Sequence, residues 1–460
     1  MAGLLLSCCT CASPAQTSVR AASASRMSSQ DQSLLRIALD GYDGGRPLEA
    51  EPTLRDLAKK YPSNYEANEA LGSLYAEAGD PARAIPYLQK SCSLAPREAL
   101  AHANLGAAYL KLTRSAEAVQ ELAKAAAIEP RNGSTQSNLG QALMLANQPK
   151  AAAKAFSIAS EIAPNDPELK YNWALALYES GSAREAADLL ERLPRGSITD
   201  QIHSLAGDAE ERAGNFEKAL THFQAAAQLN PSDANLYALT TELLRHWTWT
   251  EAIEVANFGS ARYPSSSHFK MAAGIAYYGK SDYKAAVGVF SSLLRADPNN
   301  AVIADLLGRS CSLLADGEEA GCGAMYDFAQ RHPGNAVTTT YAAVAILHEP
   351  QEKQDLEKAA ALLQSAIAAN PSYAEAYFQM GVLEQTRLHW KESAVDLERS
   401  IALRPKSPEA HYRLSRAYTH LGRRDDAQTQ IALHQTYSQQ AKDNLDAKMQ
   451  EVVRFLLKPS

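Results

Sequence analysis

The sequence lacks any long apolar run, any excess of basic residues and any strong strand pattern. None of its 460 residues belongs to an uninterrupted apolar stretch of about eighteen residues, the length that a membrane-spanning helix needs. Its 45 lysines and arginines stand against 52 aspartates and glutamates, which gives a formal charge of −7. A general nucleic-acid binder needs a basic face to displace counterions. We therefore expect no transmembrane span and no nucleic-acid partner.

Catalytic motifs are also absent. The sequence contains no GxSxG, HExxH or GxGxxG pattern. Residues 274–281, GIAYYGKS, match the phosphate-loop pattern letter for letter. A phosphate loop must follow a buried strand and open a helix, whereas Gly274 falls inside an expected helix. We therefore predict that the protein is not an enzyme and has no catalytic residue, no cofactor and no metal site.

What the sequence does contain is a regular period of about 34 residues. Four prolines recur at this period, and those that close a regular unit are preceded, at even intervals, by an alanine and then a glycine. Small residues let two helices approach closely, and a proline ends the second helix because it has no N–H and restricts the residue before it. The regular triplets are Gly72, Ala84 and Pro96, then Gly106, Ala118 and Pro130, then Gly140, Ala152 and Pro164.

This spacing resembles the tetratricopeptide repeat, a helix-turn-helix unit of the same length. The resemblance covers nearly the whole chain, and it implies an all-α fold: a right-handed superhelical solenoid of about twelve helix-turn-helix repeats. A stack of repeats needs a cap with a polar outer side. The tail has apolar residues on one side of a helix, which predicts a C-terminal capping helix. These residues are Leu445, Met449, Val452, Val453, Leu456 and Leu457.

The expected organisation has three parts: a leader over residues 1–28, tandem repeats over 29–438, and an amphipathic capping helix and tail over 439–460. The register slips in places. Unit five has no closing proline where one is due, unit twelve has none either, and unit ten has extra residues that predict a longer turn over 348–355. No Pro/Gly/Ser-rich linker interrupts the array, so we expect one elongated solenoid rather than separate globular domains.

The leader differs in composition from the rest of the chain. It has a short apolar stretch followed by Cys8, Cys9 and Cys11 and then by small polar residues. It resembles the end of a secretory signal, or a lipoprotein box that would place a lipid anchor at Cys8, although it has no basic segment and a short apolar run. We expect a periplasmic or secreted protein; a disordered leader on a cytoplasmic protein is the alternative. The three cysteines lack the CxxC spacing of a metal site.

The other cysteines lie in the repeats. Cys92 falls on a second helix, where we expect it to act as a small buried hydrophobic residue. Cys311 and Cys322 lie on the two helices of unit nine, near where these helices face each other. In an exported protein they can form a disulfide; two free thiols in the core are the alternative.

The strongest functional pattern is a ladder of three asparagines. Asn104, Asn138 and Asn172 recur at the repeat period, each two residues before the small residue of a first helix. The resemblance places this position in the concave groove, and implies paired hydrogen bonds to the backbone of an extended peptide, as in the repeat region of O-linked N-acetylglucosamine transferases. Asparagine is also common there in the family consensus, so inheritance alone is the alternative explanation.

Further residues share the groove positions, and toward the C-terminus they are aromatic and basic. Tyrosine and arginine are enriched at binding hot spots, which favours a partner with acidic or aromatic side chains. We predict a non-enzymatic scaffold that binds a peptide or protein partner in the concave groove. The alternative is an accessory subunit of an envelope machine for polysaccharide export or pilus assembly, and an enzyme or glycan-binding protein comes third. The residues are Gln141, Tyr171, Tyr178, Tyr237, Tyr278, Arg309, Phe378, Tyr412, Arg413 and Arg416.

Overall fold

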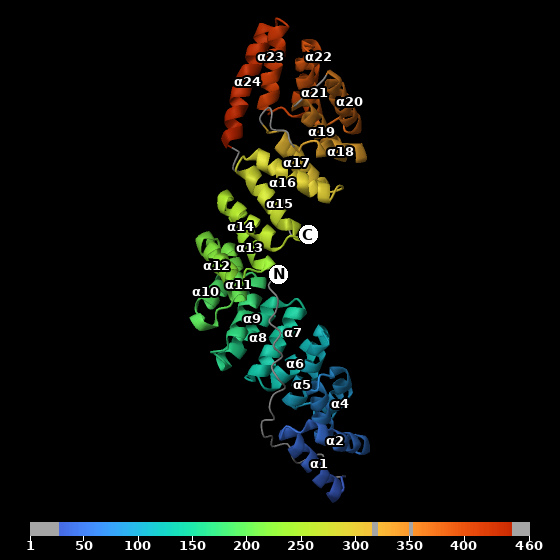
Figure 1. Ribbon diagram of the computed structural model, residues 1–460. Helices are drawn as coiled ribbons and strands as arrows, with labels where there is room; N and C mark the ends of the chain where they lie inside the picture. Colours follow the sequence, from blue (N-terminus) through green and yellow to red (C-terminus); the bar gives the residue numbers. More distant parts are fainter. Residues whose placement is uncertain (1–26, 315–320, 349–352, 444–460) are drawn as a thin grey trace. The chain divides into compact units, whose positions relative to one another are not determined.

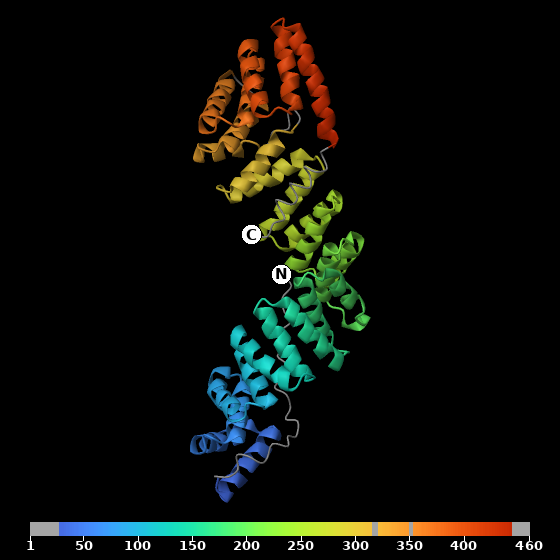
Figure 2. The same cartoon turned by 180° about the vertical axis from the view of Figure 1, so that it is seen from behind.

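A computed structural model describes residues 27–314, 321–348 and 353–443. These residues form 24 α-helices and a short 3₁₀ turn, with no strand among them, which confirms the all-α prediction. The helices follow one another as antiparallel pairs, seen from two sides in Figures 1 and 2. They belong to two compact units, residues 1–229 and 230–460. In the described ranges no helix is long and apolar enough to cross a membrane.

Unit 1 holds six helix pairs, in which an odd-numbered first helix precedes an even-numbered second helix. The bounds are α1 Ser29–Asp43, α2 Pro47–Lys60, α3 Tyr65–Glu77, α4 Pro81–Leu94, α5 Ala99–Lys111, α6 Ser115–Ile128, α7 Gly133–Leu145, α8 Pro149–Ile162, α9 Pro167–Glu179, α10 Ala183–Glu191, the 3₁₀ turn Arg195–Ser197, α11 Asp200–Arg212 and α12 Phe216–Leu229.

Unit 2 holds the other six pairs in the same alternation. The bounds are α13 Asp233–Arg245, α14 Trp249–Arg262, α15 Ser267–Gly279, α16 Tyr283–Ala296, α17 Ala301–Cys311, α18 Ala324–Arg331, α19 Ala336–His348, α20 Lys353–Ala369, α21 Ala374–Thr386, α22 Trp390–Leu403, α23 Pro408–His420 and α24 Arg424–Asp443.

The small residues at the repeat spacing are contact points between paired helices. A Cβ atom added at Gly140 on α7 would lie 2.6 Å from a ring atom of Phe156 on α8, and one at Gly106 would lie 2.5 Å from Leu122. Both distances are too short for real carbon contacts. At these two positions only glycine lets the paired helices approach so closely. The large side chains around these contacts fill the remaining space and form the core.

Several closing prolines also contact the helix that follows them. The helix before Pro130 ends at Ile128, and Gln136, six residues after the proline, donates from Nε2 to the Pro130 carbonyl at 2.8 Å. His102 and His411 lie at the same position and contact the carbonyls of Pro96 and Pro405 at 3.2 and 2.8 Å. This position therefore ties a first helix to the end of the preceding repeat.

Two helices depart from the predicted register for reasons visible in the sequence. The second helix of repeat five, α10, ends at Glu191 after nine residues because Pro194 follows it. In repeat twelve, Gln439 stands where the closing proline is due, and α24 continues through it to Asp443. The predicted boundary at residue 438 falls within α24, where no proline stops the helix, and it stays a prediction.

Cys311 and Cys322 form a disulfide in repeat nine, across a sequence separation of 11 residues. Cys311 is the last residue of α17, and Cys322 lies just before α18. Both are buried. The structure thus selects the disulfide over the two free thiols that the sequence left open.

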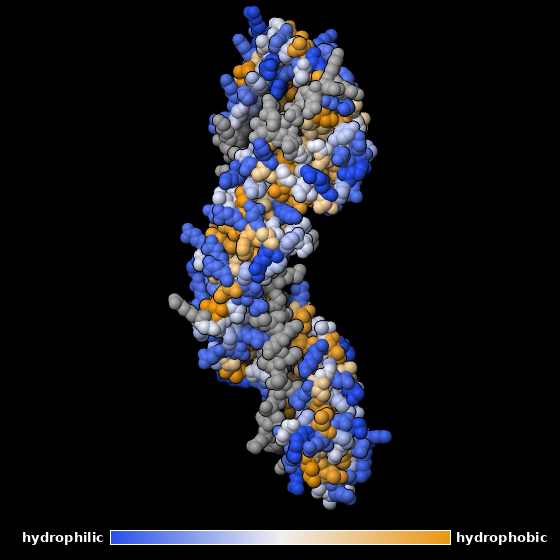
Figure 3. Space-filling view, viewed as in Figure 1, coloured by the Kyte–Doolittle hydropathy of each residue, from blue (hydrophilic) through white to orange (hydrophobic). Residues whose placement is uncertain are grey.

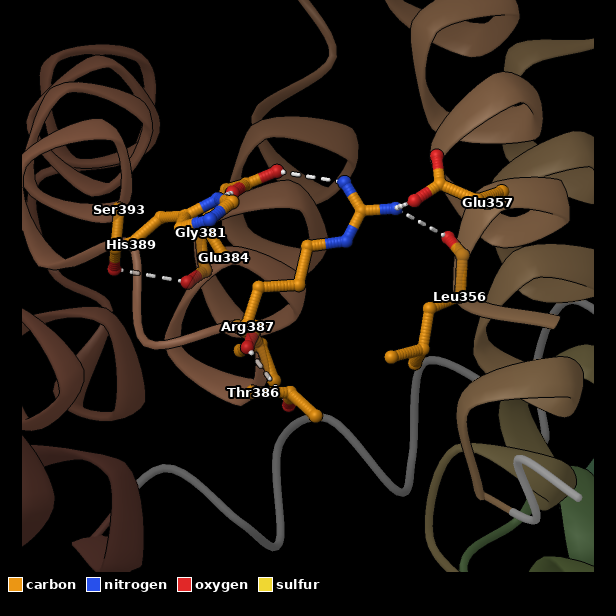
Figure 4. A network of polar contacts seen from close by, with 9 residues as sticks. Leu356, Glu357, Gly381, Glu384, Thr386, Arg387, His389 and Ser393 are labelled. Atoms are coloured by element: carbon orange, nitrogen blue, oxygen red, sulfur yellow. Dashed lines mark hydrogen bonds and ion pairs between the residues drawn. The ribbon is translucent and has the colours of Figure 1, made fainter. Parts of the chain in front are cut away.

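Arg387 joins repeats ten and eleven within unit 2 (Figure 4). It is the C-cap of α21, and its Nη2 donates to the Leu356 carbonyl of α20 at 2.9 Å while Nη1 lies 3.2 Å from Glu384 Oε1. His389 Nδ1 lies 2.7 Å from the other oxygen of Glu384. The arginine is 16% exposed, so one largely buried guanidinium connects neighbouring repeats by charge-assisted hydrogen bonds.

Some predictions lie outside the described residues. These are the leader with the lipid anchor at Cys8, residues 349–352 of the predicted turn over 348–355, and the capping helix beyond Asp443. They stay predictions.

Candidate functional site

The predicted binding residues lie on first helices, which contact one another in sequence within each unit. In unit 1, α3 contacts α5, α5 contacts α7, and α7 contacts α9; in unit 2, α17 contacts α19, α19 contacts α21, and α21 contacts α23. We call the surface that these odd-numbered helices form in each unit its first-helix face. In Figure 3, hydrophobic residues lie in small groups among hydrophilic ones on the visible side of each unit.

Asn104 on α5 is already engaged by its own protein. Its Nδ2 donates to Glu69 Oε1 at 2.7 Å and to Ser73 Oγ at 2.9 Å, both on the preceding first helix, α3. Asn104 and Glu69 are 5% and 6% exposed. Asn104 therefore takes part in packing between neighbouring first helices, where its amide satisfies a buried carboxyl group.

Glu69 is the acidic centre of this contact. Burial raises its pKa above the ordinary value, and hydrogen bonds from neighbours, with Asn104 first among them, oppose the rise. Glu69 is not among the residues predicted from the sequence, although it stands three residues before Gly72, directly beside the ladder position.

The other two asparagines differ from Asn104. Asn138 on α7 is 8% exposed and, within the described part of the chain, its amide makes no hydrogen bond. Asn172 on α9 and Gln141 on α7 are 2% and 1% exposed, and each is engaged in an interaction. The three ladder residues thus share a position and burial, but only Asn138 keeps an uncommitted amide.

Two tyrosines of unit 1 are held by neighbours on the first-helix face. Burial, with Asp208 as the second cause, raises the pKa of Tyr171. The guanidinium of Arg212 lies over the Tyr178 ring, 3.8 Å from its centroid, and donates to the Tyr178 carbonyl at 2.9 Å. Arg212 therefore connects α11 to α9 in the manner of a cation–π contact.

The aromatic residues at the start of unit 2 pack against rings on neighbouring helices. Tyr237 on α13 lies 4.5 Å from the His268 ring and 6.1 Å from Phe269, centroid to centroid. Tyr278 on α15 meets Tyr283 edge-on at 5.5 Å. Both tyrosines therefore take part in packing between helices. Both rings are half-buried, so neither offers a large docking surface.

A polar and aromatic cluster follows on α17 and α19. Arg309 Nε donates to Asp305 Oδ2 at 2.8 Å, so the predicted arginine is paired on its own helix. Tyr341 is not among the residues predicted from the sequence, but it stands two residues before Ala343, the same position as the ladder asparagines. Burial raises the pKa of Tyr341 well above its ordinary range, with Tyr373 and Asp305 as further causes.

The last first helix, α23, carries two arginines of a different kind. Within the described residues, neither Arg413 nor Arg416 has a carboxylate partner or a side-chain hydrogen bond. Burial lowers the pKa of the Arg413 guanidinium, and the charge of Arg416 lowers it further. Beside them Tyr412 is 43% exposed, with its ring 5.4 Å from that of His434 on α24. Phe378 on α21 is half-buried in the adjoining core.

The phosphate-loop pattern has no phosphate-loop structure. Gly274 lies within α15, where an added Cβ would come 2.6 Å from Phe290. Lys280 is the C-cap of the same helix, and Ser281 follows with a φ of 63°. The glycine serves helix packing, and the lysine ends a helix instead of opening one.

Models of the tetratricopeptide repeat match several segments of the sequence. One model matches residues 35–99 and 237–301, a second matches 114–171 and a third matches 201–233. These segments fall on the helix pairs described above, with glycines at the same contact points. The chain is a tetratricopeptide-repeat protein.

This tetratricopeptide-repeat protein matches no curated protein, but it is similar to many solved structures. Naa15/Naa10 bound to HypK-THB is 13% identical, with 88% of this chain and 68% of that chain covered and a TM-score of 0.42. YrrB, described as having an unusual peptide-binding site, is 23% identical, with 40% and 95% covered and a TM-score of 0.36. PilF of Pseudomonas aeruginosa is 20% identical, with 45% and 94% covered and a TM-score of 0.35. Such distant similarity concerns the fold alone.

Proposed function

We propose that this tetratricopeptide-repeat protein is a non-enzymatic scaffold that binds an acidic segment of a partner protein on the first-helix face of unit 2. Arrays of such repeats present extended binding surfaces built from successive units. The observation that carries the proposal is the pair Arg413 and Arg416, two guanidiniums on one helix that have no carboxylate partner among the described residues. Arg413 is half-buried whereas Arg416 is exposed, and a cation withdrawn from water is costly unless it is paired. An incoming carboxylate would relieve that cost at Arg413.

Other arginines of unit 2 show the contrast. Arg404 lies 2.6 Å from Glu375, and Arg423 lies 2.7 Å from Asp426. Their charges are satisfied within the protein, and exposed pairs of this type contribute little to binding or stability. Arg413 and Arg416 also lie beside the exposed ring of Tyr412, and tyrosine and arginine together are the residues that dominate binding energy at interfaces.

The test is a titration of the purified chain with a fluorescent peptide of alternating glutamate and tyrosine, followed by anisotropy. We expect binding that weakens as salt is added, no binding of the matching lysine–tyrosine peptide, and a loss of about tenfold or more in the Arg413→Gln/Arg416→Gln variant. Arg404→Gln is the matched control and should bind like the parent. Equal affinity of the double variant and the parent would contradict the proposal.

The asparagine ladder supports a smaller contribution in unit 1. Asn138 has an uncommitted amide that can pair with a peptide backbone, whereas Asn104 is committed to Glu69. We propose that Asn138 adds to peptide binding by about 0.5 to 1.5 kcal/mol, the usual net value of one hydrogen bond. Asn138→Ala should weaken a bound peptide accordingly while the thermal midpoint stays unchanged. An unchanged affinity would mean that Asn138 follows the family consensus and does not contribute to binding.

A second candidate function is an accessory subunit of an envelope assembly or export machine, and the disulfide favours it. Disulfides persist in oxidising compartments such as the periplasm and are rare in the cytosol, and Cys311 and Cys322 are joined. The test is differential alkylation of the protein taken directly from its native cell, followed by mass spectrometry. An oxidised pair supports the exported location, and two free thiols contradict it.

A further inference from the structure

Three side chains with metal-binding donors meet where repeats two and three join in unit 1. Cys92 comes from α4, His102 from α5 and Glu121 from α6. One ligand atom of each, the thiol sulfur, an imidazole nitrogen and a carboxylate oxygen, lies within 4.8 Å of the other two. The side chains of His102 and Glu121 are 6% and 13% exposed, so the donors lie inside the protein.

The imidazole of His102 is oriented by its second nitrogen. Nε2 lies 3.2 Å from the Pro96 carbonyl oxygen. Because a carbonyl oxygen only accepts, Nε2 carries the proton, and Nδ1 is left to face Glu121 Oε2 at 2.6 Å. A metal-binding histidine ordinarily donates its other N–H to a carbonyl or carboxylate, which fixes the ring. His102 already has that outer partner.

Glu121 is oriented in a comparable way. Its Oε2 faces His102, while its Oε1 lies 2.8 Å from Lys124 Nζ. Ligating carboxylates are themselves hydrogen-bonded through the oxygen that does not face the metal. In the absence of a metal, Nδ1 and Oε2 contact each other directly, and an ion would replace that contact.

We propose that Cys92, His102 and Glu121 bind one zinc ion through the thiolate, Nδ1 and Oε2. Mixed sulfur, nitrogen and oxygen donors suit zinc, whereas calcium and magnesium prefer oxygen alone. Zinc–ligand bonds of about 2.0 to 2.3 Å place tetrahedral ligands about 3.3 to 3.7 Å apart. The 2.6 Å separation of Nδ1 and Oε2 therefore has to widen by about 1 Å.

Binding requires the Cys92 thiol to lose its proton, because the thiolate is the form that binds the metal. Three protein ligands leave the fourth tetrahedral position to a water molecule or to an added ligand. Because the ligands come from three different helices, the ion would brace the junction of two repeats, and its binding energy would add to the stability of the folded unit.

The chain contains a natural control for this site. His411 has the same orientation, with Nε2 2.8 Å from the Pro405 carbonyl and Nδ1 2.6 Å from Gln430 Oε1. In register with Cys92 and Glu121, that repeat has Ile401 and Gln430. A histidine at this position thus serves packing by itself, and the added thiol and carboxylate distinguish the His102 site.

The test uses the full chain with Cys8, Cys9 and Cys11 replaced by serine, so that the leader cannot bind the ion. Zinc is titrated against a competing chelator, and cobalt is added separately to read the thiolate-to-cobalt charge-transfer absorption. We expect one ion per chain and a sulfur–cobalt band. Cys92→Ala should abolish the band, and Cys92→Ala and His102→Gln should each weaken zinc binding by about 100-fold or more. His411→Gln should bind as the parent does.

The rate of Cys92 alkylation is a second measurement of zinc binding, and it needs no substitution in the core. Zinc should slow the reaction of Cys92 with a maleimide in the parent chain by about tenfold or more, because the sulfur would be ligated and buried. No sulfur–cobalt band in the parent chain, zinc affinity unchanged by Cys92→Ala, or alkylation unaffected by zinc would each overturn the proposal.

Discussion

Replacing Asn104 by alanine should destabilise unit 1 even though the residue lies at a position associated with ligand binding. The substitution removes the donor to Glu69 Oε1 and the donor to Ser73 Oγ. A hydrogen bond to a carboxylate is worth about 1.5 to 3 kcal/mol and a neutral one about 0.5 to 1.5 kcal/mol. Ser73 keeps a 3.3 Å contact with the carboxyl oxygen, which recovers part of the loss. We expect a decrease of about 2 to 3 kcal/mol in the free energy of unfolding.

Asn138→Ala is the matched control. It removes the same amide at the same position of the next repeat, but that amide has no hydrogen-bond partner in the described structure. We expect a change within about 0.5 kcal/mol. Glu69→Gln in the Asn104→Ala background should restore much of the loss, because the neutral amide removes the buried carboxyl group whose pKa burial raises.

Urea unfolding followed by circular dichroism, with thermal melts alongside, measures these differences. The parent, the two single variants and the Glu69→Gln/Asn104→Ala double variant form the comparison. Equal destabilisation by Asn104→Ala and Asn138→Ala would refute the reasoning, since it would mean that the contact with Glu69 contributes nothing beyond the loss of an amide.

Three further predictions concern packing, pH and nucleotides. Gly140→Ala should cost about 1 to 3 kcal/mol because its Cβ would press on Phe156, whereas Gly288→Ala, with nothing within 4 Å, should stabilise by about 0.5 to 1 kcal/mol; urea unfolding checks both signs. Burial, aided by Glu384, raises the pKa of Asp396 to about 6. Its contribution to stability is therefore present below about pH 4 and lost as the pH rises through 6, and Asp396→Asn should raise the melting temperature at about pH 7 but not at about pH 4. Calorimetry should detect no ATP binding by the parent, and saturable binding lost in Lys280→Ala would contradict the structural account of that loop.

The repeat architecture followed from the sequence because its markers act locally. A glycine that must admit Phe156, or a proline that ends a helix near Ile128, has the same meaning in every unit. Helix lengths differ where the marker is displaced or missing, as at Pro194 after α10 and at Gln439 within α24. These local markers therefore predict the helix pairs well. Where a marker is missing, tertiary packing decides where the helix ends.

The candidate binding residues could be placed on the right helices but not assigned their partners. Asn104 and Asn138 are identical in the repeat pattern, yet only Asn104 meets a glutamate, because the preceding repeat has Glu69 where the next has Ala103. The meeting of Cys92, His102 and Glu121 likewise depends on three helices of two repeats. Such contacts join positions that differ between units, so a single periodic pattern does not reveal them.

Photo-crosslinking with mass spectrometry tests the central proposal most directly. An acidic glutamate–tyrosine peptide with a benzophenone at its centre is bound to the full chain and irradiated, and the labelled residues are identified. The account predicts labels on the first-helix face of α23 around Arg413 and Arg416, lost in the double glutamine variant and kept in Arg404→Gln. Labels confined to second helices, or labels on α23 that survive the loss of both arginines, would contradict it.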